Sequence, residues 1–162
     1  MNIWNFEIRV YGMNGSDPSE NANLLTLATD QIGEIAQNQD VITVHYGNGV
    51  IKFPSKVTFN DVDWTLNCYC SPSVLPALRE WSEQVYNSRT EEMGLPSEYM
   101  RNVYFIRYDG RGNVRQVLKA PGTFITALRT GDMNQEGGNV VKITVTLVIS
   151  KVIYLTEEEF QQ

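Results

Sequence analysis

The stretch Val57–Tyr86, VTFNDVDWTLNCYCSPSVLPALREWSEQVY, decides the fold because its hydrophobic period changes halfway along. In the first half, Trp64, Leu66 and Cys68 recur at every second position, with other residues between them. Successive side chains of a strand point to opposite faces, so this alternation predicts a strand with one buried face.

The second half of the stretch has the period of a helix. Its apolar residues recur at three- and four-residue spacing, which places them in one stripe. Pro72 and Pro76 are compatible with a helix only near its first turn, and the hydroxyl of Ser71 or Ser73 can accept from the unpaired amides there. We therefore predict one helix, over about residues 73–88, that lies on a sheet. The predicted helix-on-sheet core consists of Trp64, Val74, Leu78, Trp81 and Val85.

Most of the remaining chain alternates in the manner of half-buried strands. Strands are expected at residues 3–12, 41–47, 50–57, 103–108, 114–118, 123–130 and 140–155. Residues 24–37 are ambiguous between strand and helix, although their threonines and Gly33 favour a strand. The last strand is expected to be the longest, with one face formed by Val141, Ile143, Val145, Leu147 and Ile149.

Turn-forming residues separate these strands. Gly47-Asn48-Gly49 predicts a tight hairpin, because Gly and Asn adopt positive φ with little strain. Asp109–Asn113, DGRGN, predicts a second hairpin rather than a phosphate loop, since it lacks the Lys-Ser/Thr pair and joins two strands. Other breaks are expected at residues 13–23, 38–40, 88–100, 120–122 and 131–139, and the acidic tail 156–162 is expected to be loose.

Seven to nine strands and one helix predict a mainly β fold. The expected architecture is an antiparallel two-sheet sandwich or partly closed β-barrel with one flanking α-helix. No internal repeat or linker divides the sequence, so residues 1–162 are expected to form one domain.

The composition limits the classes of function. The chain has 162 residues and a formal net charge of −6. Proteins that grip phosphates usually carry a positive excess, so tight binding of nucleic acid is disfavoured. The N-terminus has no basic leader followed by an apolar core, and no run approaches the roughly 20 apolar residues that span a bilayer. These features predict a soluble protein without a membrane anchor.

No constellation of residues predicts catalysis. His45, the single histidine, has no nucleophile motif nearby, so a surface or interface position is favoured. Asp61 and Asp63 can form a carboxylate pair, but such a pair more often caps a turn at the entrance of a strand. Cys68 and Cys70 have poor spacing for a disulfide and lack a second pair of metal ligands, which favours two buried thiols. We expect no enzyme, no cofactor and no metal site.

The strand edges are more informative. The hairpin arms around Gly47–Gly49 and Gly131–Gly138 alternate in polarity, yet neither of their faces is clearly a core face. Proteins normally protect exposed strand edges from pairing with other chains. The alternative is that neighbouring copies of the protein pair with these edges. A head-to-tail contact of that kind closes into a ring when its rotation closes. The residues alone therefore indicate a β-rich assembly subunit.

Several motifs, in their order along the chain, resemble the tail tube protein of contractile-tailed, T4-like bacteriophages. The most specific piece is Asp63-Trp64-Thr65 followed by a helix that contains Glu80-Trp81. The loop Met13–Asn23 departs from the pattern, because it is longer than expected. The motifs cover most of the chain and are NFEIRVYG, FNDVDWTLNCY, LREWSEQV, YDGRGNVRQVLKAPG and VVKITVTLVISKVIY.

This resemblance implies a structural subunit of the virion tail, assembled in the cytoplasm of the host bacterium. Members of the family form hexameric rings that stack into a hollow tube inside a contractile sheath. The implied partners are further copies of the protein, the sheath protein, a baseplate tube initiator and a tail terminator. DNA is a transient, non-specific passenger, and an acidic wall would let it slide.

Two other classes of protein stay open. The same fold occurs in the inner-tube proteins of type VI secretion and pyocin-like contractile injection systems. A β-sandwich binder or enzyme is the third alternative, and it would need a concave pocket with convergent polar groups.

The resemblance also suggests where assembly contacts lie. Extended loops form ring-to-ring contacts in the family, and the matching segment here is Tyr46–Lys56. Its expected contact residues are Tyr46, Lys52, Phe53 and Lys56, although Phe53 could equally belong to the core. The expected lumen-facing acids are Glu34, Asp40, Asp132 and Glu136, for which ordinary surface positions are the alternative.

Overall fold

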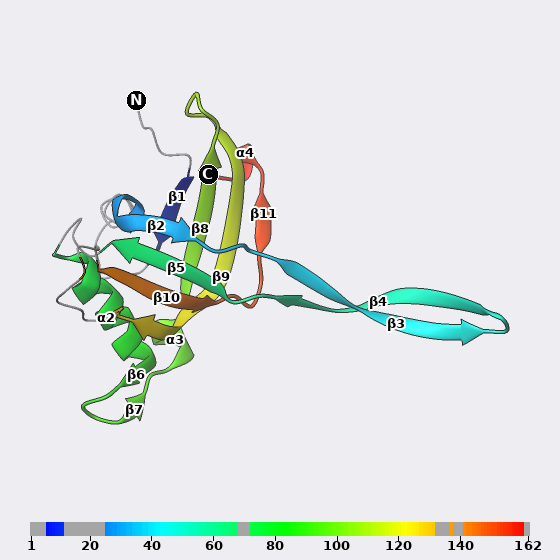
Figure 1. Ribbon diagram of the computed structural model, residues 1–162, viewed down its shortest axis with the longest axis horizontal. Coiled ribbons are helices and arrows are strands. Elements are labelled where there is room, and N and C mark those ends of the chain that lie inside the picture. The colour runs from blue at the N-terminus through cyan, green and yellow to red at the C-terminus, as the bar shows by residue number, and fades with distance from the viewer. Residues whose placement is uncertain (1–5, 12–24, 68–71, 132–136, 138–140, 161–162) are drawn as a thin grey trace.

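The computed structural model describes residues 6–11, 25–67, 72–131, 137 and 141–160 (Figure 1). The helices are α2 (Val74–Val85), α3 (Pro96–Tyr99) and α4 (Glu157–Phe160), and a helical turn spans residues 25–28. The strands are β1 (Phe6–Val10), β2 (Thr29–Ile32), β3 (Gln37–Tyr46), β4 (Gly49–Phe59), β5 (Val62–Asn67), β6 (Tyr86–Asn87), β7 (Glu92–Met93), β8 (Arg101–Tyr108), β9 (Val114–Arg129), β10 (Lys142–Val148) and β11 (Ile153–Leu155).

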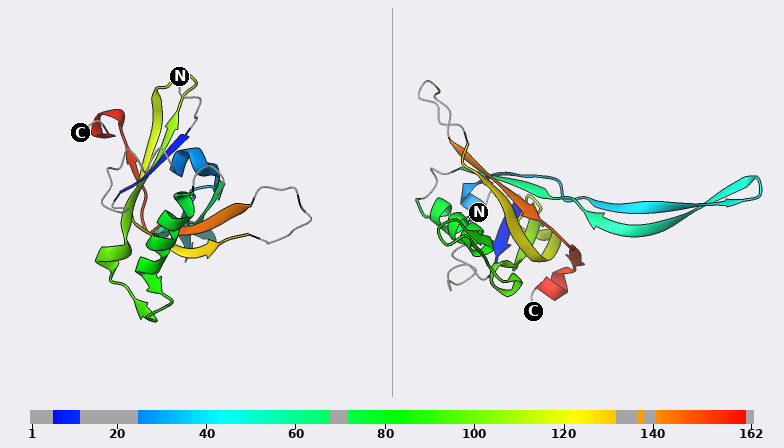
Figure 2. Two further views of the ribbon diagram at one scale, coloured as in Figure 1. Left: turned by 90° about the vertical axis from the view of Figure 1, so that its left-hand side faces the viewer. Right: turned by 90° about the horizontal axis from the view of Figure 1, so that it is seen from below.

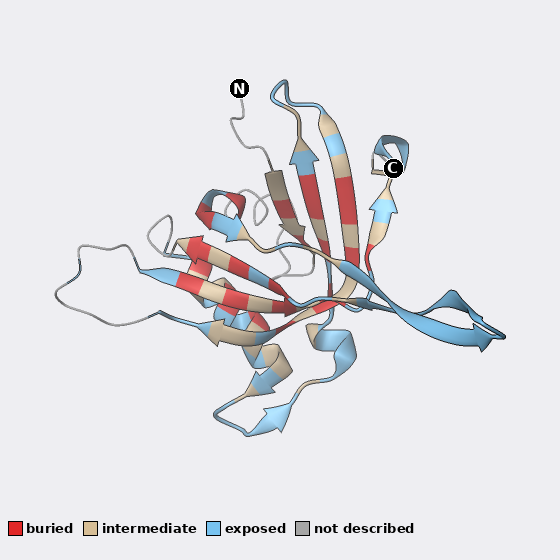
Figure 3. Ribbon diagram, turned by 45° about the vertical axis from the view of Figure 1, so that its right-hand side comes forward, coloured by how far each residue is buried: buried red, intermediate tan, exposed pale blue. Residues whose placement is uncertain are grey.

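The longest of these strands, β9, joins two parts of the main sheet. The hydrogen-bonded order is β1-β8-β9-β10-β5-β2, β11 also pairs with β9, and each of these pairs is antiparallel. The first part of β9 pairs with β8 and β11, whereas residues 124–129 pair with β10. Between the two parts Gly122 has a φ of +68°, which glycine adopts without a steric penalty. The chain therefore passes from one layer to the other within a single strand, and Figure 3 shows buried residues along the strands of both parts.

Two tryptophans anchor the core. Trp64 on β5 is fully buried, and its indole N–H donates to Thr29 Oγ1 at 2.9 Å. Trp81 on α2 is also buried, and its indole N–H donates to the backbone oxygen of Tyr99 at 2.9 Å. Each indole thus buries a large apolar surface while its one polar atom keeps a partner.

The predicted helix and its apolar stripe are confirmed. α2 begins and ends within the predicted span 73–88 and packs against β9. Ser73 is the N-cap residue, but its side chain does not form the predicted capping hydrogen bond. The buried members of the stripe are Val74, Leu78 and Trp81, and Val85 is half-buried.

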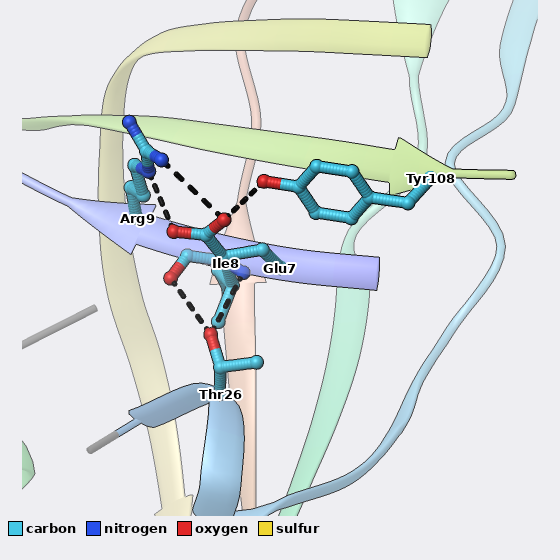
Figure 4. Close-up of polar contacts among 5 residues, drawn as sticks. All are labelled: Glu7, Ile8, Arg9, Thr26 and Tyr108. Carbon is cyan, nitrogen blue, oxygen red and sulfur yellow. Dashed lines mark hydrogen bonds and ion pairs between the residues drawn. The ribbon is translucent and has the colours of Figure 1, made fainter. Parts of the chain in front are cut away.

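A side-chain contact bridges the seam between the two ends of the sheet. β1 and β2 end the hydrogen-bonded order and do not pair with each other. The buried hydroxyl of Thr26 accepts from the N–H of Ile8 at 3.2 Å and donates to the oxygen of Ile8 at 3.4 Å (Figure 4). Thr26 thus binds the backbone N–H and C=O groups of Ile8, which an added strand would otherwise use for its hydrogen bonds to β1. The sheet is partly closed in this way, without a continuous ladder around it.

The outer face of β1 and β8 carries a polar cluster beside α4. The Arg9 side chain donates from Nε to Glu7 Oε1 at 2.6 Å, and the Tyr108 hydroxyl donates to Glu7 Oε2 (Figure 4). The Arg9 guanidinium lies 5.2 Å from the centroid of the Phe160 ring. Burial first, and then the hydrogen bond to Glu7, raise the pKa of Tyr108 to about 12.

The mainly β, antiparallel architecture with a flanking helix is confirmed, but two predicted strand boundaries are wrong. Ala120-Pro121-Gly122 bends β9 without ending it, because the strand changes layers there. The predicted strand 140–155 is two strands, since β10 pairs with β5 whereas β11 pairs with the first part of β9. On its predicted apolar face, Val141 is exposed, and the buried members are Ile143, Val145, Leu147 and Ile149.

Several other predictions missed regular structure. Residues 38–40 lie within β3 because pairing with β4 continues through them. Residues 25–28 are helical where a strand was favoured, the connection 88–100 contains β7 and α3, and the expected loose tail contains α4. The described residues thus hold eleven strands instead of seven to nine. Cys68, Cys70 and the loop Met13–Asn23 lie outside the described residues.

Candidate functional site: an exposed hairpin arm and the pocket at its base

β3 and β4 form a long hairpin that leaves the body of the molecule, and we call residues 37–59 the arm. Its strands pair only with each other, and each of its residues is exposed except Phe59, which is half-buried. Figures 1 and 2 show the arm extending away from the body on the side opposite α2. Because an isolated two-stranded hairpin is marginally stable in water, this arm is unusual without a covering layer.

The pairing register divides the arm into two unlike faces. Ile42 pairs with Phe53 and Val44 with Ile51, and alternation places Tyr46 on the same face. We call these five side chains the apolar face of the arm. They are 44–77% exposed, with Tyr46 at the upper limit. The opposite, mixed face carries Val41, Thr43, His45, Val50, Lys52 and Pro54.

Only two of the four predicted contact residues share a face. Tyr46 and Phe53 lie on the apolar face, whereas Lys52, which pairs with Thr43, lies on the mixed face. Lys56 lies nearer the body, where the register shifts at a bulge. The alternative position of Phe53 in the core is wrong, because 51% of this residue is exposed.

The structure describes only two of the four acids that were predicted to face the lumen. Glu34 is exposed in the connection between β2 and β3, and Asp40 is exposed on the arm at the bulge. Asp132 and Glu136 lie outside the described residues. The orientation of the four acids toward a lumen therefore stays a prediction.

A pocket opens in the body where the arm begins, and we call it the base pocket. It has a volume of about 350 Å³ and lies between the β2–β3 connection and the strands β1, β8, β9 and β11. Its larger apolar walls are formed by Phe6, Ile32, Ile35, Phe105, Leu118 and Tyr154. Its polar side chains are Glu34, Arg107 and Gln116, whereas the side chain of Glu7, another lining residue, lies on the opposite, outer face of β1 from that of Phe6.

The polar side chains of the base pocket differ from Glu7 in their hydrogen bonding. On the outer face, the Glu7 carboxylate already accepts hydrogen bonds from Arg9 and Tyr108. In contrast, Glu34, Arg107 and Gln116 have no hydrogen bond or ion pair to another side chain in the part of the chain that the structure describes. The sequence could not reveal this pocket, because its lining comes from five separate segments without a shared motif.

The residues whose types could support catalysis, His45, Asp61 and Asp63, do not line the base pocket. His45 is exposed on the mixed face of the arm. Asp63 accepts from the Thr146 hydroxyl at 2.9 Å, and Asp61 precedes β5 in an exposed position. Among the described residues, no group of three or more His, Cys, Asp or Glu side chains could hold a metal ion.

The predicted hairpin at Asp109–Asn113 is confirmed as a turn. The Asp109 carboxylate accepts from the backbone N–H groups of Arg111 and Asn113, both at 2.9 Å. The bond from Asn113, the largest effect, lowers the pKa of Asp109 below its ordinary value. Elsewhere, no helix in the described ranges is long and apolar enough to cross a membrane.

Comparisons with known proteins show which solved structures share this fold. No protein-family model matches the sequence, and no curated protein matches it. A chain from the PVC sheath/tube terminator of an extracellular contractile injection system matches with a TM-score of 0.68 at 13% identity, over 96% of both chains. A chain from the tube-terminating cap of the anti-feeding prophage has a TM-score of 0.68 at 14% identity, over 96% of this chain and 91% of that one.

A further match is a chain from the PVC sheath-tube complex in its extended state. Its TM-score is 0.64 at 13% identity, over 96% of this chain and 91% of that one. Identities this low establish a shared fold without establishing a shared activity. The protein thus has the fold found in chains of the terminator, cap and sheath-tube assemblies of contractile injection systems.

Proposed function

We propose that the protein is a structural subunit of the tail tube of a contractile, phage-type tail. The arm carries this proposal, because five large apolar side chains lie exposed on one face of a projecting hairpin. Large exposed apolar patches are rare on monomers and usually mark contact surfaces. The fold shared with chains of contractile injection systems supports the same role.

The arm also suggests how copies associate. A projecting arm on one copy and a body on the next are unlike surfaces, so their contact is heterologous and repeats from copy to copy. In the proposed assembly, hexameric rings stack through the arms into a hollow tube inside a contractile sheath. A baseplate initiator and a tail terminator would lie at its two ends, as the tail-tube resemblance implies.

DNA is the passenger in this proposal. The net charge of −6 opposes phosphate binding, so duplex DNA would pass through the lumen without being held. The exposed acids Glu34 and Asp40, with Asp132 and Glu136, are the candidates for the lumen wall. This role needs neither catalysis nor a cofactor, and it places the protein in the virion tail.

An inner-tube role in a type VI secretion or pyocin-like injection system is the second candidate. It is favoured by the matching chains, which come from an extracellular contractile injection system and the anti-feeding prophage. Native particles from the producing cell distinguish the two roles. A DNA-filled capsid attached to the tube supports the phage tail, and sheathed tubes without a capsid support the injection system.

Electron microscopy of arm variants tests the proposed function. The double variant Ile42→Asp/Phe53→Asp places two charges on the apolar face, and Thr43→Asp/His45→Asp places two on the mixed face as a matched control. We expect rings or tubes from the wild type and the control, and dispersed subunits from the apolar-face variant. Unimpaired tubes from the apolar-face variant would contradict the assigned role of the arm.

A further inference from the structure

We propose that the base pocket receives the Tyr46 side chain from the arm of a second copy of this chain. This inference rests on the proposed function, in which copies contact one another through their arms. It adds the receiving surface, which lies on the body between the β2–β3 connection and the sheet that contains β8.

The reach of the arm prevents a copy from filling its own pocket. β3 runs ten residues from Gln37 to Tyr46, and an extended strand rises about 3.3 Å per residue, so its ends lie roughly 30 Å apart. Glu34 and Ile35, just before this strand, line the pocket. Pairing with β4 continues to Gly49 and keeps the tip extended. The occupant must therefore come from another copy.

Tyr46 has the form of an interface anchor. It is 77% exposed, the largest value among the exposed large apolar side chains of the arm, and it directly precedes the turn at Gly47. Aromatic side chains that enter desolvated pockets carry much of the binding energy of interfaces. Tyrosine also combines an apolar ring with a hydroxyl that needs a partner once it is buried.

The base pocket matches both parts of this side chain. Phe6, Phe105 and Leu118 offer apolar walls for the ring. The unoccupied polar groups of Glu34, Arg107 and Gln116 can accept from, or donate to, the hydroxyl. A volume of about 350 Å³ lies at the lower end of the roughly 300–1,000 Å³ range of ligand pockets, which suits a single ring.

Photocrosslinking identifies the surface that Tyr46 contacts. p-Benzoylphenylalanine replaces Tyr46, and full-length protein is mixed from unlabelled and ¹⁵N-labelled pools so that mass spectrometry separates contacts between copies from contacts within one. We expect crosslinks between copies at residues 32–35, 105–107 or 116–118. Crosslinks between copies at other surfaces would overturn the pocket while leaving the arm-mediated assembly standing. An absence of crosslinks between copies, with only monomers in solution, would overturn both.

Filling the pocket provides an independent test. Gln116→Trp should occupy it, and Arg115→Trp is the matched control because this neighbouring side chain is 72% exposed and lies on the other face of β9. We expect Gln116→Trp and Tyr46→Ala to raise the protein concentration needed for assembly at least tenfold, while Arg115→Trp changes it less than twofold. Melting curves show whether each variant folds. If one does not, the crosslinking result alone decides whether Tyr46 contacts the base pocket of another copy. Assembly of a folded Gln116→Trp protein at the wild-type concentration would refute the proposal.

Discussion

The body and the arm are built from the same kinds of residue but differ in what covers them. In the body, alternating apolar side chains such as Trp64 and Val145 are fully buried between layers. In the arm, Ile42, Val44 and Phe53 alternate in the same way and are about half exposed. Periodicity therefore predicts a strand with an apolar face in both regions, but it does not reveal whether the cover comes from the same chain or from another.

Removing an aromatic anchor of the body should have the largest effect on stability. Trp81→Ala should lower the free energy of unfolding by about 3–5 kcal/mol, because a large buried ring and its hydrogen bond to Tyr99 are lost. Urea denaturation measures the change, with Glu83→Ala on the exposed side of α2 as the control. A loss below about 1 kcal/mol would contradict the helix-on-sheet core, since surface substitutions stay within about 0.5 kcal/mol.

The seam should be the next most sensitive position. Thr26→Val keeps the shape of the side chain but leaves the N–H and C=O groups of Ile8 without their partner, which should cost about 1–3 kcal/mol. Thr126→Val is the matched control, because the Thr126 hydroxyl makes an exposed bond to the Thr146 oxygen. Equal denaturation midpoints for the two variants would show that Thr26 does not close the edge of β1.

Alkaline pH should lower the free energy of unfolding by a smaller amount, through the polar cluster around Tyr108. The folded state raises the pKa of Tyr108 to about 12, so it favours the neutral phenol. The resulting stabilisation is complete below pH 10, the ordinary value, and is lost as the pH rises toward 12. Urea denaturation of the wild type and Tyr108→Phe between pH 9 and 12 should show a steeper decline for the wild type. Parallel declines would argue against a protective environment at Tyr108.

Charges on the arm should have the smallest effect on the stability of one subunit. Because Ile42 and Phe53 are exposed, Ile42→Asp/Phe53→Asp should change the free energy of unfolding of dispersed subunits by no more than about 0.5 kcal/mol. Denaturation at concentrations below the assembly threshold measures this. A loss of several kcal/mol would mean that the arm packs against its own body, which would remove the contrast between the two regions.

The sequence predicts the fold well where local pattern and packing agree. The helical stripe of Val74, Leu78 and Trp81 and the turn at Gly47 are local signals, and both are confirmed. The breaks expected at Ala120–Gly122 and at Asn38–Asp40 are wrong, because pairing with distant strands overrides local turn propensity.

The candidate site is less predictable, for a different reason. Alternation predicted that the arm is an assembly element, but only the register shows that Tyr46 and Phe53 share a face while Lys52 does not. The base pocket depends on five segments that meet only in the folded chain, so no window of sequence contains it.

The continuity of arm and body has a mechanical consequence. β3 follows β2 after a short connection, and β4 leads into β5 after only Asn60 and Asp61, so both legs of the arm continue into paired neighbours of the body. Figure 1 shows β5 lying along a direction similar to that of the arm. Bonds between antiparallel strands run perpendicular to the strands. A pull along the arm draws β2 and β5 in the same direction and shears the bonds of β5 to β10 together instead of peeling them one by one. Axial force on the arm is thus distributed across the sheet before it reaches any single contact of the core.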